Sequence, residues 1–169
     1  MKNILYRLML LLPILLNYSC SDDDNASTNP INQLPEATQT GENTFGCLLD
    51  GEAFIPGGGR NPLDCVYQFV DGGYYFHLQG NKRNADFNLL SINLVTRTKE
   101  IKHGETYELI EEAMGNATGI YSFSANLSFT SAQHSGELTI TRLDLNENIV
   151  SGTFWFDVID QNGELREIR

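Results

Sequence analysis

The sequence predicts an all-β fold, with an antiparallel β-sandwich as the first choice and a small up-and-down β-barrel as the alternative. From Phe45 onward, apolar and polar residues alternate with a period of two, which is typical of half-buried strands. Turn-forming pairs such as Asp-Gly and Asn-Gly interrupt this alternation about every ten residues. At 169 residues the chain is long enough for one domain with its own core, and we assign residues 45–169 to that domain.

About eight or nine short strands are expected in this domain. The clearest alternation is YSFSANLSF, in which one strand would place Tyr121, Phe123, Ala125, Leu127 and Phe129 on a single face. Shorter segments with the same alternation are CVYQFV, YYFHL, LSINL, TYEL, ELTI and GTFWFDVI. Tight turns are expected between them at Asp50-Gly51, Asp71-Gly72 and Asn162-Gly163, because these pairs supply the positive φ that hairpins require.

The first 19 residues are predicted to be a signal peptide that is removed from the mature protein. Lys2 and Arg7 flank an apolar run from Leu8 to Leu16, and small Ser19 follows it. This run is too short to span a bilayer, which needs about 20 apolar residues. A buried N-terminal helix is the alternative interpretation.

The run LLNYSC, which ends at Cys20, resembles the signal of bacterial lipoproteins, although Asn17 stands where such signals usually have leucine. The resemblance implies that Cys20 carries a lipid, with acyl chains such as palmitate, that anchors the protein to a membrane. The following residues, SDDD, resemble the acidic export tag of Bacteroidetes lipoproteins. That implies an outer-membrane protein exposed at the cell surface. The start of a solvated linker is the alternative for these aspartates.

Residues 20–44 are expected to form a flexible acidic tether between the lipidated Cys20 and the domain. They are rich in Ser, Thr, Asn and Pro, and Ile31 and Leu34 are their only large aliphatic residues. Such a segment cannot bury enough apolar surface to offset the entropy lost on ordering.

Three stretches of the domain resemble uncharacterised β-sandwich domains of Bacteroidetes lipoproteins. They are TFGCLLDGEAFIP, HGETYEL and SGELTITRLDLNENIVSGTFWFDVIDQNGE. The resemblance implies a sandwich fold, and that family has no established activity.

Charge argues against two classes of partner. The chain has 22 acidic and 11 basic side chains, which gives a net charge of −11. Nucleic acids require clusters of Lys and Arg to neutralise their phosphates, so no nucleic-acid partner is expected. Anionic lipid surfaces should repel a chain with this net charge, so attachment to a membrane is expected through the lipid on Cys20.

Two cysteines of the domain are a possible disulfide pair. Three cysteines leave an odd thiol, and lipidation of Cys20 would leave Cys47 and Cys65, both on the apolar phase of their strands. In a simple meander, the first and third strands would be about 9 to 10 Å apart, beyond the roughly 7 Å that a disulfide tolerates. A disulfide and two buried free thiols therefore both remain open.

No catalytic, metal or cofactor site is expected. His77, His103 and His134 are scattered, with no order that indicates a catalytic triad. No two histidines or cysteines have the spacing of structural zinc ligands. We therefore predict a protein that is not an enzyme and that holds no cofactor, and a hydrolase is the alternative.

Two aromatic residues are candidates for a binding platform. Tyr75 and Trp155 each lie between two residues of the apolar phase, so both side chains should point away from the core. Outward aromatic rings on a sheet can bind glycans or proteins, although they can also be covered by a loop. The expected function is that of a lipid-anchored surface module that binds a glycan or an envelope protein. A structural subunit of an envelope complex, without a small ligand, is the alternative.

Overall fold

The fold is known from a computed structural model, which describes residues 29–169. The predicted signal peptide and Cys20 lie outside these residues. The described part contains one short 3-10 helix, η2 (Pro30–Gln33). Its strands are β1 (Cys47–Leu49), β2 (Glu52–Phe54), β3 (Leu63–Val70), β4 (Gly73–Arg83), β5 (Leu89–Thr96), β6 (Thr106–Leu109), β7 (Ala117–Phe123), β8 (Asn126–Phe129), β9 (Gly136–Asp144), β10 (Ile149–Ile159) and β11 (Leu165–Ile168).

All eleven strands belong to one sheet, in the order β2-β1-β11-β10-β9-β6-β7-β5-β4-β3, and β8 adds to β7. Every pairing is antiparallel except the single parallel contact of β6 with β7, at Leu109 and Ala117. The all-β class is therefore confirmed. The alternative of a small up-and-down barrel is wrong, because β2 and β3 stay at opposite edges of the sheet and do not pair. The strands share one continuous sheet, whereas a sandwich has two separate ones.

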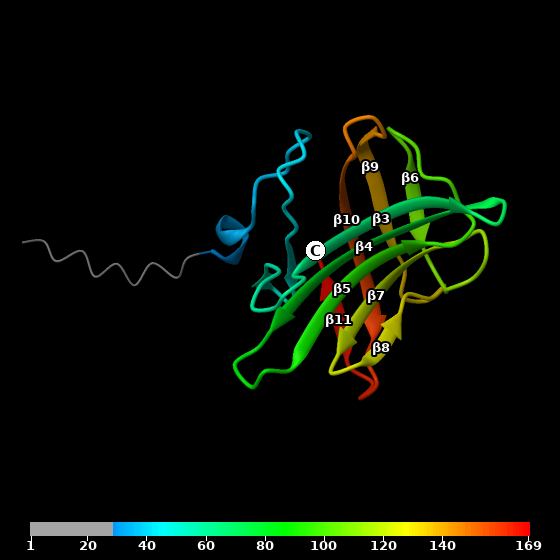
Figure 1. Ribbon diagram of the computed structural model, residues 1–169. Coiled ribbons are helices and arrows are strands. Elements are labelled where there is room, and N and C mark those ends of the chain that lie inside the picture. Colours follow the sequence, from blue (N-terminus) through cyan, green and yellow to red (C-terminus); the bar gives the residue numbers. More distant parts are fainter. Residues whose placement is uncertain (1–28) are drawn as a thin grey trace, which may run out of the picture.

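The sheet curls so that its two halves face each other across the core. In Figure 1, β3, β4, β5 and β7 cross in front of β9, β10 and β11. Contact between the halves is close at Gly119 on β7, where an added Cβ would lie 2.7 Å from the ring of Phe156 on β10. The largest fully buried side chains come from both halves and include Phe54, Phe76, Ile92, Leu94, Leu109, Ile140, Phe156, Val158 and Ile168.

Two of the predicted glycine turns adopt the backbone that the sequence requires. Asp50 and Gly51 have φ of 52° and 84° and join β1 to β2, while Asp71 and Gly72 have φ of 48° and 83° and join β3 to β4. Positive φ at both central residues is the geometry of a two-residue hairpin.

The prediction of one strand through YSFSANLSF is wrong. Ser124 and Ala125 have φ of 48° and 71° and turn the chain, so the segment forms the hairpin of β7 and β8. Tyr121 then lies opposite Ser128, and Leu127 is on the other face with 56% of its surface exposed. Alternation alone gave no sign of this turn, because neither residue is a usual former of positive φ.

Candidate functional site

A cleft of about 930 Å³ opens between β3 and the hairpin of β9 and β10. Its apolar wall includes Leu63, Tyr67, Leu78, Leu143, Val150 and Phe154. Ligand sites in proteins typically occupy about 300 to 1,000 Å³ and are lined mainly by apolar side chains. The cleft therefore has the size of a binding site, and its wall is partly apolar and partly polar.

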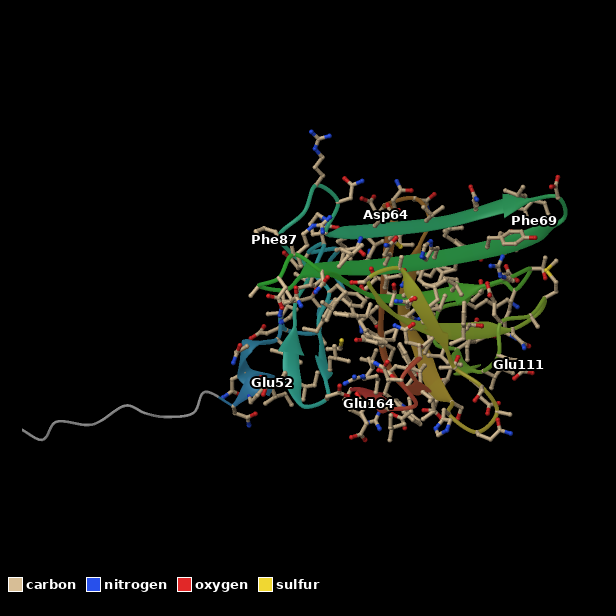
Figure 2. The ribbon with its side chains drawn as sticks, turned by 90° about the horizontal axis from the view of Figure 1, so that it is seen from below. Glu52, Asp64, Phe69, Phe87, Glu111 and Glu164 are labelled. Atoms are coloured by element: carbon tan, nitrogen blue, oxygen red, sulfur yellow. The ribbon has the colours of Figure 1, made fainter. Side chains whose placement is uncertain are left out.

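The cleft is open because β3 lies at the edge of the sheet. Tyr67 and Phe69 lie opposite Phe76 and Tyr74 of β4, so they share the inner face with the core. Phe76 is only 2% exposed, but Phe69 is 61% exposed and Cys65 is also exposed. The facing half of the sheet therefore covers the inner face of β4. It leaves parts of the inner row of β3, which consists of Leu63, Cys65, Tyr67 and Phe69, in contact with solvent. Figure 2 shows Asp64 and Phe69 along this outermost strand.

The backbone of β3 also has a free edge. Asn81 N donates to Pro62 O at 2.7 Å, and the ladder with β4 continues in register from Leu63 to Val70. Hydrogen bonding alternates along an antiparallel pair, so the even-numbered residues of β3 bond to β4. The odd-numbered residues of β3 therefore point their N–H and C=O groups away from β4, namely Leu63, Cys65, Tyr67 and Phe69. At this edge, no other strand within residues 29–169 pairs with β3.

The segment before β1 forms a further wall of the cleft. The ring of Phe45 stacks on that of Phe154, with centroids 5.2 Å apart. Arg142 Nη1 donates to Gln39 O at 2.5 Å, and residues 35–46 line much of the cleft. The last part of the predicted tether thus packs against the domain.

Most of the charged side chains that line the cleft are acidic. Glu36, Glu42, Asp64 and Asp144 all line it. Among the described residues that line the cleft, Arg169 is the only basic one, and it is paired with Asp157 at 2.7 Å and with Glu167 at 3.0 Å. The rim therefore favours a neutral or positively charged ligand.

Cys47 and Cys65 are both free thiols, so the disulfide that the sequence left open is not formed in this structure. Cys47 is 2% exposed, and burial raises the pKa of its thiol to about 12. Cys65 is exposed to solvent, but apolar neighbours partly desolvate it and, together with Asp64, raise its pKa to about 11. The thiol of Cys65 is therefore accessible to solvent, whereas that of Cys47 is buried in the core.

Tyr75 and Trp155 are not brought together. Each alternates with a core residue, Phe76 and Phe156 respectively, so each points outward from its own half of the sheet. Four strands separate β4 from β10 in the sheet order. Trp155 is 39% exposed, its Nε1 donates to Glu137 Oε2 at 3.3 Å, and the guanidinium of Arg169 lies 5.5 Å from its ring centroid. A joint platform of these two aromatic rings is therefore not formed.

The histidines do not converge on a nucleophile in the described part of the chain. His77 Nε2 lies 3.1 Å from Asn93 Oδ1 on the outer face of β4 and β5. His103 lies between β5 and β6, and His134 lies just before β9. Within residues 29–169, no group of three or more His, Cys, Asp or Glu side chains is arranged to hold a metal ion.

Residues 29–169 include no helix that is long and apolar enough to cross a membrane. Comparison with known proteins gives no relationship from which a function could be transferred. No family model, no curated protein and no solved structure matches the chain.

Proposed function

We propose that this protein is a non-enzymatic binding module of the outer membrane, held at the cell surface by a lipid on Cys20, and that it binds another envelope protein. The observation that supports this proposal is the exposure of Cys65 and Phe69 in the inner row of β3, beside a cleft of about 930 Å³ with a partly apolar wall. In this proposal, the two facing halves of the sheet act as the layers of an antiparallel sandwich that is open at β3.

The chemistry of the edge favours an extended strand as the bound segment. Such a strand would pair with the outward N–H and C=O groups of Cys65, Tyr67 and Phe69. Its alternate side chains would point toward the cleft, where the wall is apolar, so large apolar residues fit there. The acidic rim favours Lys or Arg at the positions between them.

A protein partner is favoured over a glycan. The glycan hypothesis rested on a platform of Tyr75 and Trp155, and the two residues lie on strands that are far apart in the sheet. The open site has an apolar wall and a free backbone edge, which suit a peptide strand better than the many hydroxyl groups of a sugar.

Site-specific photo-crosslinking in cells that express the full chain tests the proposal. A benzophenone side chain replaces Phe69, which is 61% exposed on β3, and in a matched control it replaces Leu127, which is 56% exposed on β8. We expect one discrete protein adduct from position 69 and none from position 127. The variant Cys65→Pro should abolish the adduct, because proline removes an edge donor without affecting the pairing of β3 with β4.

Other outcomes would favour the other functions. The absence of any adduct from position 69 would overturn the proposal. A glycan-array signal that Trp155→Ala abolishes would favour a glycan ligand. A stable envelope complex in which the edge amides of Cys65, Tyr67 and Phe69 still exchange freely would favour a structural subunit. Reproducible turnover of a substrate by the purified chain would favour a hydrolase.

A further inference from the structure

Three of the four basic residues that have no acidic partner among residues 29–169 lie at one end of the domain. The chain has 11 Lys and Arg, and Lys2 and Arg7 precede residue 29, which leaves nine in the described part. Five of these nine form ion pairs with carboxylates, namely Arg97, Lys102, Arg142, Arg166 and Arg169. The four without such a pair among residues 29–169 are Arg60, Lys82, Arg83 and Lys99.

Three of these four residues lie near the end of β4. Gly57 forms a bridge with Lys82, and its N–H donates to Asn81 O at 2.8 Å, so the loop after β2 runs along β4. An added Cβ on Gly58 would lie 3.6 Å from Cβ of Arg83. Arg60, in the same loop, and Arg83 are both exposed. A local positive charge therefore lies on a domain that is acidic overall.

An aromatic side chain projects into solvent from the adjoining hairpin of β4 and β5. Phe87 is 79% exposed and has φ of 63°, a conformation that phenylalanine rarely adopts. The loop is held in place, because Arg83 Nη1 donates to Phe87 O at 2.8 Å and Phe87 N donates to Asn84 O at 3.0 Å. Asn84 Oδ1 also accepts from Asp86 N and Asn88 N. The structure thus fixes an apolar ring outside the core.

The described chain begins at the same end of the domain. Figure 2 shows Phe87 on the side where the first described residues, drawn in blue, lie, and Phe69 at the opposite end. Ile55, in the loop after β2, is 39% exposed, and η2, which contributes Ile31 at 55% exposure, packs against β2. Cys20 and Asn29 are nine positions apart, which an extended chain spans in at most about 30 Å.

We propose that Ile55, Arg60, Arg83 and Phe87, which we name the anchor-side surface, rest on an anionic membrane surface. Aromatic rings are stable at the level of lipid headgroups, and arginine is attracted to anionic lipids. Asp86 in the same hairpin and Glu52 on β2, which Figure 2 shows on the same side of the domain, are acidic, so the attraction to anionic lipid depends on Arg60 and Arg83. The inference rests on the lipid anchor of the proposed function. It adds an orientation, in which Phe87 faces the membrane and Phe69 faces away from it.

Lipid quenching of a single tryptophan tests this orientation. Trp155 is the only tryptophan, so Trp155→Phe gives a background into which Phe87→Trp or Phe69→Trp is introduced. The acylated full chain is inserted into vesicles of equal amounts of phosphatidylcholine and phosphatidylglycerol, prepared with and without brominated acyl chains. We expect brominated lipid to quench the tryptophan at position 87 and to leave that at position 69 unchanged. Adding Arg60→Glu should weaken the quenching.

A second measurement needs no substitution. In the wild-type chain, hydrogen exchange of the amides of residues 84–88 should slow on vesicles, while that of residues 65–69 should not. An acylated chain with neither quenching at position 87 nor protection of residues 84–88 would overturn the orientation and leave the anchor standing. A chain that carries no acyl group and does not bind vesicles would overturn both the orientation and the anchor. Equal quenching at positions 87 and 69 would also overturn the orientation.

Discussion

The rings of Phe45 and Phe154 stack with their centroids 5.2 Å apart, which joins the segment before β1 to β10. Phe45 also lies against Gly80 of β4, where an added Cβ would come within 2.7 Å of its ring. One aromatic side chain thus connects both halves of the sheet beside the cleft, although it precedes the first strand.

Phe45→Ala should destabilise the protein by about 3 to 5 kcal/mol, because Phe45 is only 7% exposed and the change leaves a cavity between the two halves. Urea unfolding followed by circular dichroism measures this free energy. Ile31→Ala, at a residue that is 55% exposed, should change stability by less than about 0.5 kcal/mol. Equal effects of the two substitutions would show that Phe45 does not connect the halves.

Gly119→Ala should destabilise the protein by about 1 to 3 kcal/mol, because the new methyl group would lie 2.7 Å from the ring of Phe156. The matched control is Gly59→Ala, where no atom lies within 4 Å of the added Cβ. Thermal unfolding of both variants measures the difference. If Gly119→Ala were neutral, β7 and β10 would not pack as closely as described.

Thiol reagents should modify Cys65 before Cys47 in the folded protein, because Cys65 is exposed and Cys47 is buried. The reactive form is the thiolate, and the pKa of Cys65 is raised to about 11, so its reaction rate should rise about tenfold per pH unit below that pH. Mass spectrometry of peptides after timed labelling locates the modified residue. Equal labelling of the two thiols at neutral pH would contradict the burial of Cys47.

Stability should fall as pH rises from about 9 to about 12. The folded state keeps a proton on Cys47, whose pKa is raised from 9.0 to about 12, while the unfolded chain releases it. The unfolded state therefore binds fewer protons, and the free energy of unfolding decreases with pH in this window. Cys47→Ala should lessen the slope in urea titrations at alkaline pH, and an unchanged slope would assign it to other groups.

Two proline substitutions on β3 should differ strongly in stability. Cys65→Pro removes an N–H that points to the free edge, so stability should change little. Val66→Pro removes an N–H that bonds to β4, opposite His77, and leaves a carbonyl without its donor, so the loss should exceed about 1 kcal/mol. Urea unfolding of both variants measures this contrast. The reverse ranking would mean that the edge of β3 is assigned to the wrong residues.

Much of the local structure follows from the sequence. CVYQFV and YYFHL form paired strands joined by Asp71 and Gly72, because the two turn residues adopt positive φ and fix the register. Ser124 and Ala125 adopt the same backbone without the usual residues, so the turn between β7 and β8 was not predictable. There, the pairing of Phe123 with Asn126 offsets a local preference against the turn.

For the candidate site, too, the sequence predicts some features and not others. The outward phase of Tyr75 and Trp155 could be predicted, because side chains alternate along any strand. Their separation could not, because it depends on the order of strands across the sheet. The alternation of Leu63, Cys65, Tyr67 and Phe69 is that of any strand in this chain, and no residue among them indicates an edge.

The sequence by itself determined the all-β class, the period of the strands, two of the glycine turns, the acidic charge and the expectation of a lipid on Cys20. These features depend on the preferences of neighbouring residues and on the composition of the chain, and both can be read without knowing the fold. The tertiary structure alone decided that the sheet ends at β3, that a cleft opens beside it, and that Arg60 lies near Lys82 and Arg83 at the end of β4. Such features arise from contacts between segments that are distant in the chain, and alternation along a single strand carries no information about its neighbours.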